Sequence, residues 1–206
     1  ALSQRRAARA FLSAFADPCG KGGSFWNLCA LFGAKSAFKQ PVFGRKRMNI
    51  TILAPGHVKE SYFAAGIAEY QKRLGAYCRL SIVELPEVRL PEQPGQKEIE
   101  RALEKEALSF AAAMPQRCYT VALCIEGRQL SSAAFSEKLH QIMLDGQSHI
   151  VFLIGSSYGL SPALKASCDF RLSFSEMTFP HTMMRLILTE QLYRAFQIAG
   201  GGKYHK

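Results

Sequence analysis

Two side chains that could act on an electron-rich partner lie four residues apart near the carboxyl end of the chain. His181 directly follows Pro180, and proline is favoured in the first turn of a helix. At this spacing the imidazole and the guanidinium share one helix face, and the helix N-terminus adds partial positive charge. The pair suits a phosphate or a nucleobase. A solvated first turn, with Arg185 paired to an acid such as Glu190 or Glu176, is the alternative.

Three segments that follow apolar, strand-like runs could surround a ligand. In parallel sheets, ligands bind beyond the carboxyl ends of the strands, and glycine lets a backbone approach a flat ligand closely. Each segment taken alone could equally be a tight turn. No G-x-G-x-x-G and no Walker lysine motif follows the first strand, which argues against a dinucleotide-binding or P-loop enzyme. The segments are Glu126-Gly127-Arg128, Gly155-Ser156-Ser157-Tyr158-Gly159 and Ser175-Glu176-Met177-Thr178-Phe179-Pro180.

The last four residues offer an aromatic ring, an imidazole and two cations. Lys203-Tyr204-His205-Lys206 follows three consecutive glycines, so this tail could swing onto an RNA base. Tyr204 and His205 could then stack on that base. The alternative is a frayed terminus without a role.

Regular secondary structure begins at Met48 and must position these groups. Apolar, β-branched runs predict strands over 49–54, 79–85, 118–125, 149–154 and 170–174. Amphipathic spacing and end signals predict helices over 58–77, 96–114, 131–145, 161–167 and 180–199. Continuous apolar strands that alternate with helices predict an α/β domain with a mostly parallel sheet and helices on both faces. No apolar run approaches the ~18 residues of a membrane span.

The net charge of +10 is concentrated before this domain. Residues 1–47 hold nine Lys and Arg and one acid, a charge of +8, whereas 48–206 hold 17 Lys and Arg and 15 acids, a charge of +2. The charge is therefore no evidence that the domain binds nucleic acid. We expect 1–47 to be a basic extension without regular structure. It could be an upstream leader read in frame, with Met48 as the true start of a cytoplasmic protein, or a transit peptide that directs the protein to an organelle.

Six cysteines are scattered along the chain without a metal-binding pattern. None forms a C-x-x-C pair, and no histidine lies at zinc-finger spacing. We expect no metal site, and we expect Cys118, Cys124 and Cys168 to be buried free thiols because they lie in or beside apolar runs. Free thiols fit a reducing cytoplasm.

An ordered series of motifs runs from Met48 to the end of the chain. It consists of Met48–Ala54, Ile154–Leu160, Leu172–His181, Met184-Arg185, Glu190–Ala195 and Tyr204–Lys206. Together these motifs closely resemble the ribosomal RNA large-subunit methyltransferase H family of the SPOUT superfamily. The ordered set is far more specific than any single motif, and the resemblance excludes 1–47.

The resemblance implies an α/β domain with a C-terminal trefoil knot and a homodimer that binds large-subunit rRNA. It further implies methylation of ring nitrogen 3 of a pseudouridine on the assembled ribosome, with S-adenosylmethionine as methyl donor and without a metal. His181 and Arg185 become candidates for catalysis, and Arg185, Tyr204 and His205 for RNA binding. By motif match, donor contacts are expected at Leu123, Gly155, Phe174, Ser175, Glu176, Met177, Thr178 and Phe179.

Two positions depart from the pattern of the family. Ser156 stands where members usually have a second glycine, and a positive φ there would cost serine roughly 1–2 kcal/mol. Pro55-Gly56-His57 stands where members usually have Val-Gly-Lys. Ser156 puts donor binding in question and keeps open the alternative of a non-catalytic RNA- or ribosome-binding module. A SPOUT enzyme that acts on tRNA is a second alternative.

Overall fold

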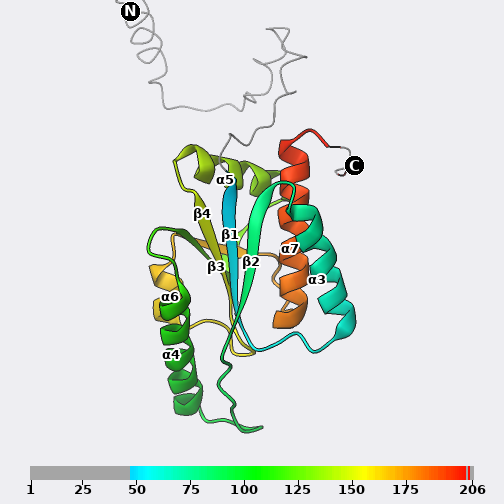
Figure 1. The fold of residues 1–206 in the computed structure, drawn as a ribbon. Helices are drawn as coiled ribbons and strands as arrows, with labels where there is room; N and C mark the ends of the chain where they lie inside the picture. Colours follow the sequence, from blue (N-terminus) through cyan, green and yellow to red (C-terminus); the bar gives the residue numbers. More distant parts are fainter. Residues whose placement is uncertain (1–46, 203, 205–206) are drawn as a thin grey trace, which may run out of the picture. The chain divides into compact units, whose positions relative to one another are not determined.

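The computed structural model describes residues 47–202 and Tyr204, so the expectation for the basic extension falls outside the described residues, except at Arg47. Strands and helices alternate along the described part, as predicted (Figure 1). The strands are β1 (Met48–Pro55), β2 (Cys78–Leu85), β3 (Tyr119–Gln129), β4 (His149–Ile154) and β5 (Phe170–Ser173). The helices are α3 (Ser61–Leu74), α4 (Gln96–Ala113), α5 (Ser132–Leu144), α6 (Pro162–Ser167) and α7 (His181–Ala199).

The five strands form one sheet in the order β2-β1-β4-β3-β5, and every neighbouring pair is parallel. The predicted mostly parallel sheet is therefore confirmed, and the observed sheet is wholly parallel. Parallel order brings the carboxyl ends of all five strands to one edge of the sheet. The segments that follow them are thereby gathered from positions far apart in the sequence.

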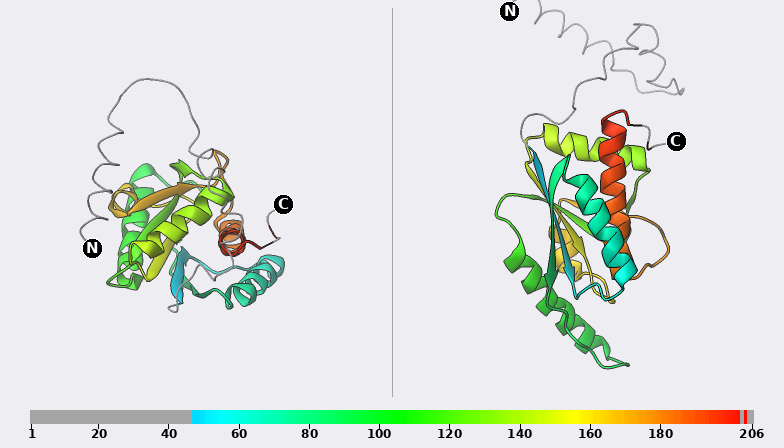
Figure 2. Two further views of the ribbon diagram at one scale, coloured as in Figure 1. Left: turned by 90° about the horizontal axis from the view of Figure 1, so that it is seen from above. Right: turned by 45° about the vertical axis from the view of Figure 1, so that its right-hand side comes forward.

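Helices cover both faces of the sheet, also as predicted (Figure 2). Ile50 and Ile52 point to the face packed by α3, α5 and α7, while Leu53 points to the face packed by α4 and α6. Side chains on both faces are apolar because a doubly covered strand has no face toward water. The trefoil knot implied by the resemblance stays a prediction. None of the described helices is long and apolar enough to cross a membrane.

Helix α3 is shorter than the predicted 58–77 at both ends. It begins at Ser61 with Glu60 as its N-cap, and the backbone N–H of Val58, before the helix, donates to the Glu84 carboxylate on β2 at 3.3 Å. The starts of α5 and α6 agree with the prediction to within one residue, and a serine side chain closes each end. Ser131 accepts from Ala134 N at 3.1 Å, and Ser161 accepts from Leu164 N at 3.2 Å.

Two further predictions were wrong in part. Glu126-Gly127-Arg128 is not a loop after β3 but the continuation of that strand, whose register shifts so that Leu172 pairs with both Leu123 and Arg128. A Cβ on Gly127 would lie 2.6 Å from the carbonyl carbon of Leu172, so the crossing leaves no room for a side chain. Among the described thiols, Cys78 is the buried one. The free thiols at 118, 124 and 168 are only partly buried.

Candidate active site

A cavity of about 930 Å³ lies at the carboxyl edge of the sheet. β1, β2, β4 and β5 contribute to it through their last residues or the segments that follow them, and β3 contributes Leu123–Glu126 from within the strand. Residues more than a hundred positions apart in the sequence therefore meet there. Its size is typical of a pocket for a small organic ligand. In the described part of the chain, no group of three or more His, Cys, Asp or Glu is placed to hold a metal ion. The lining includes His57, Glu60, Glu87, Leu123–Glu126, Ile154–Leu160, Leu172–Ser175 and Met177–Thr182.

Seven of the eight residues predicted to contact the donor line this cavity. They are Leu123, Gly155, Phe174, Ser175, Met177, Thr178 and Phe179. Glu176, the eighth, is exposed and does not line it. The segment after β5 is held by its own hydrogen bonds, since Ser173 Oγ donates to the Ser175 carbonyl at 2.9 Å and Met177 N donates to Ser175 Oγ at 3.0 Å.

The Gly155–Gly159 loop closes on itself. Gly159 N donates to the Ser156 carbonyl at 2.9 Å, and Gly159 has φ +81°. A Cβ on Gly155 would overlap the carbonyl group of Gly159. Glycine at position 155 is therefore required by loop closure alone, before any ligand is considered. Ser156 raises no such difficulty, because no non-glycine residue in the described part has a positive φ.

Arg185 is fully buried behind the cavity and does not line it. Its Nη1 donates to Glu84 Oε1 at 3.2 Å, and its Nη2 donates to the carbonyls of Pro55 and Gly56, the latter at 3.0 Å. Nε is buried without a hydrogen-bond partner among the described residues. The acid that pairs with it is thus Glu84, and neither of the two acids expected from the sequence.

Glu84 also reaches the exposed rim of the cavity, where its Oε2 pairs with His57 Nδ1. One carboxylate therefore connects a residue of the cavity wall to the buried guanidinium. The sequence did not predict the pairing of Glu84 with His57. An alternating strand pattern does not show which side chain at the end of a strand will contact a residue on a distant helix.

His181 lies in the cavity wall at the start of α7, beside the turn at Gly56. Burial, and next the charge of Arg185, lower the pKa of its imidazole, while Glu87 and Glu60 act in the opposite direction. A histidine with a lowered pKa is neutral at pH 7 and has a nitrogen free to accept a proton. The structure thus brings His181 to the cavity and holds its neighbour Arg185 behind it.

Tyr204 lies at the other end of α7. Its ring packs edge-on against Tyr193 at 5.1 Å, and the guanidinium of Arg194 lies 4.7 Å from its centroid. Its hydroxyl donates to Glu190 at 3.3 Å. The helical rise between positions 181 and 193 is about 18 Å, so Tyr204 is far from the cavity of its own chain. His205 lies outside the described residues.

Glu106 on α4 is a second acid that sequence analysis did not single out. Its side chain is 3% exposed and lies against the outer side of the cavity wall, with Oε1 accepting from Val88 N at 3.4 Å. A signal was present in the sequence. Ala102 and Phe110, four residues to either side, are both buried, so this glutamate occupies the apolar stripe of its helix.

Comparison with known proteins identifies the family. Residues 48–205 match the family described as predicted SPOUT methyltransferase. The chain is 46% identical over 159 residues to ribosomal RNA large subunit methyltransferase H from two strains of Limosilactobacillus reuteri, and the matches cover 77% of this chain and 100% of each relative.

Two solved structures are similar at lower levels. One is a probable methylase family protein from Haemophilus influenzae Rd KW20, with a TM-score of 0.44 and 15% identity over 78% of this chain and 71% of that one. The other is a SpoU methyltransferase from Streptomyces viridochromogenes in complex with the cofactor AdoMet, with a TM-score of 0.39 and 17% identity. This match covers 79% of this chain and 62% of that one. From the family match and the end-to-end identity to the L. reuteri proteins, this chain belongs to the SPOUT methyltransferases and, among them, to the ribosomal RNA large subunit methyltransferase H family.

Proposed function

We propose that this protein transfers a methyl group from S-adenosylmethionine to ring nitrogen 3 of a pseudouridine in large-subunit ribosomal RNA, on the assembled ribosome and in the cytoplasm. The observation that carries the proposal is the cavity at the carboxyl edge of the sheet. Seven of eight positions matched to donor contacts line it, in a chain that aligns along the whole length of a ribosomal RNA methyltransferase.

The size and the lining of the cavity support this donor. Residues of the Gly155 loop and of the segment 174–179, apart from Glu176, line it, and backbone groups can hold adenine without charged side chains. The bound donor supplies a methyl group already activated on a sulfonium. The chain must therefore align the acceptor nitrogen and favour loss of its proton.

His181 supplies the proton acceptor in this proposal. It lies in the cavity wall, and burial together with Arg185 keeps its imidazole neutral. As the methyl group moves from sulfur to N3, the N3 proton passes to the imidazole, and the sulfur keeps the electron pair of the broken bond. The first turn of α7 adds positive potential that stabilises charge developing on the base.

Arg185 supports this arrangement from behind the wall, since it fixes the turn at Gly56 next to His181. RNA contacts are proposed for Tyr204 and His205. Because Tyr204 packs about 18 Å along α7 from His181, we propose a homodimer in which the tail of one subunit serves the cavity of the other. The exposed apolar side chains of Ile125 and Met177 at the cavity rim support a partner surface there.

The alternative of a non-catalytic module rested on Ser156, and that position carries no positive-φ strain. Calorimetric titration with S-adenosylmethionine separates the two, because an enzyme binds the donor and a bare module does not. Ribosomes from a deletion strain, incubated with the protein and a donor labelled in its methyl group, test the substrate. We expect label on one pseudouridine of the large-subunit rRNA, found by mass spectrometry. Label on tRNA alone would support the other SPOUT alternative.

A further inference from the structure

Glu106 is a buried carboxylate whose charge nothing in the described part of the chain balances. It is 3% exposed, forms no ion pair there, and its Oε2 has no hydrogen-bond partner among the described residues. Burial, together with the charge of nearby Glu87, raises the pKa of this carboxyl, while the Ser156 hydroxyl and the Val88 N–H oppose that rise. A buried anion without a partner is costly, so a residue in this position needs an explanation.

The position of Glu106 relates it to the cavity. Oε1 accepts from the backbone of Val88, directly after Glu87, and the Ser156 hydroxyl lies beside the carboxylate from the other side. Both Glu87 and Ser156 line the cavity. Glu106 therefore lies immediately behind the wall that these two residues form, where its negative potential extends into the cavity through low-dielectric surroundings.

That potential matters because the charge of the ligand changes during the reaction. The sulfonium of S-adenosylmethionine is positive, and after the methyl group leaves, the sulfur is a neutral thioether. All other charged groups of the two molecules are the same. A fixed negative charge behind the wall therefore attracts the donor more strongly than the product.

We propose that Glu106 is a specificity-determining residue that makes the cavity prefer the charged methyl donor over the neutral thioether product. The proposal rests on the proposed identity of the donor. It assigns a function to the otherwise unbalanced charge, since bound donor compensates the carboxylate and product does not. Loss of that compensation after transfer favours exchange of product for fresh donor.

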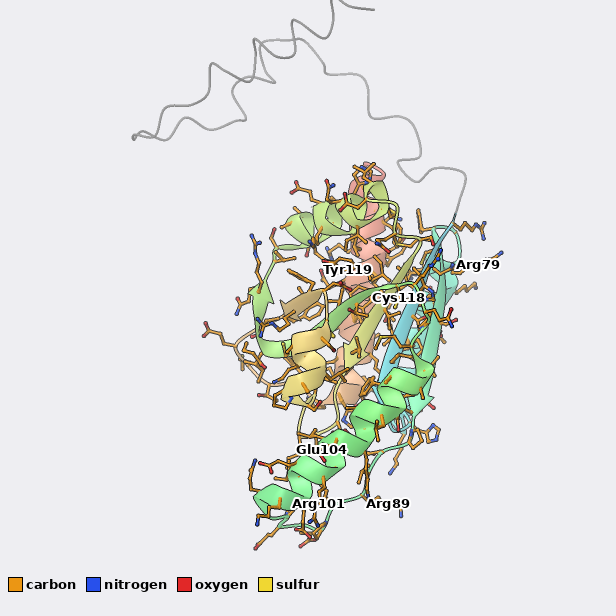
Figure 3. The ribbon with its side chains drawn as sticks, turned by 90° about the vertical axis from the view of Figure 1, so that its left-hand side faces the viewer. Arg79, Arg89, Arg101, Glu104, Cys118 and Tyr119 are labelled. Atoms are coloured by element: carbon orange, nitrogen blue, oxygen red, sulfur yellow. The ribbon has the colours of Figure 1, made fainter. Side chains whose placement is uncertain are left out.

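The test compares the dissociation constants of S-adenosylmethionine and S-adenosylhomocysteine by calorimetry in the full-length protein and in Glu106→Gln. We expect the preference for the donor to fall by about tenfold in the variant, mainly through weaker donor binding. Glu104→Gln removes an exposed charge from the same helix (Figure 3) and should leave the preference unchanged. Glu106→Leu should repeat the effect, and neither Glu106 variant should melt lower than the parent, because an unpaired buried charge is removed.

The outcomes are distinguishable. If both ligands bind the variants as tightly as they bind the parent protein, the inference is wrong while the proposed function stands. Equal weakening of both ligands would mean that Glu106 only shapes the wall, and would also overturn the inference. If the parent protein binds neither ligand, the proposed donor itself is wrong and the inference fails with it.

Discussion

Arg185 on α7 and Glu84 at the end of β2 form an ion pair, with Nη1 3.2 Å from Oε1, although 101 positions separate them in the sequence. The same guanidinium donates to the backbone at Pro55 and Gly56, where β1 ends. One side chain thus joins two strand ends to the first turns of the last helix. The wall that carries His181 depends on this junction.

Replacing Arg185 should therefore lower stability. Arg185→Ala leaves Glu84 and two carbonyls without their donor, and we expect the free energy of unfolding to fall by about 3 kcal/mol, at the lower end for a broken buried pair because Glu84 keeps contact with water. Urea unfolding followed by circular dichroism measures it. Arg73→Ala, which breaks an exposed pair with Glu69, is the control and should change stability little. Equal effects of the two substitutions would contradict the junction.

Gly155→Ala should weaken donor binding by at least tenfold, because its Cβ would meet the Gly159 carbonyl and force the loop open. The far-UV circular dichroism spectrum should stay unchanged, since the loop is outside the sheet. Calorimetry with S-adenosylmethionine gives the affinity. Gly95→Ala meets only a side-chain atom at 3.7 Å and should bind normally, as should Ser156→Gly. Normal affinity in the Gly155 variant would contradict this, because it would show that the loop can accommodate the added Cβ without loss of donor binding.

The rate of methyl transfer should follow the protonation of His181. Protonated imidazole accepts no proton, so the single-turnover rate should rise with pH through a pKa below the usual value of about 6.5 and then level off. The physical causes of that low pKa are burial and the charge of Arg185. His181→Gln should remove this step from the pH profile. His149→Gln changes another histidine of lowered pKa, which lies at the opposite edge of the sheet beside Thr51, and should retain the step. Persistence of the step in His181→Gln would assign the proton acceptor elsewhere.

Deletion of Tyr204–Lys206 should reduce methyl transfer to ribosomes by at least tenfold and leave donor affinity unchanged, because the tail is proposed to contact RNA in the partner's site. Single-turnover assays beside donor titrations measure both quantities. Normal turnover in a protein that lacks Tyr204–Lys206 in both subunits would contradict the proposed role of the tail.

Mixed dimers add a sharper test of the shared site. One subunit lacks the tail but keeps an intact cavity, and the other keeps its tail but carries Gly155→Leu. If the tail of one subunit serves the cavity of the other, these dimers contain one complete site and should be active. Inactive mixed dimers would show that each tail serves its own subunit.

A protein that begins at Met48 should fold and work like the full chain. Met48 is the first residue of β1 and pairs with Cys78, and the family match also begins there. We expect a melting temperature within a few degrees of that of the full chain and unchanged methyl transfer. By light scattering this shorter protein should have twice the mass of one chain. Insolubility would show that the preceding residues are structural.

The sequence by itself determined the strands and helices and the edge of the sheet at which the cavity lies. Strands and helices follow from local periodicity, which each segment carries within a few residues, and continuous apolar strands predict the parallel, doubly covered sheet. Parallel order then places the segments after β4 and β5 together. Motif resemblance added the donor positions, of which all but Glu176 line the cavity.

The tertiary structure alone decided where the charged side chains point. Arg185 has a helical spacing that suits either the cavity or the interior, and only the approach of β1 and β2 supplies the carbonyls and the carboxylate that draw it inward. Gly127 lies inside a strand because β3 resumes pairing with β5 at Arg128, opposite Leu172. Glu106 lies behind the cavity wall because the chain returns to it at Ser156, far along the sequence and after β4. Such partners are set by packing between distant segments, and no local pattern of residues encodes them.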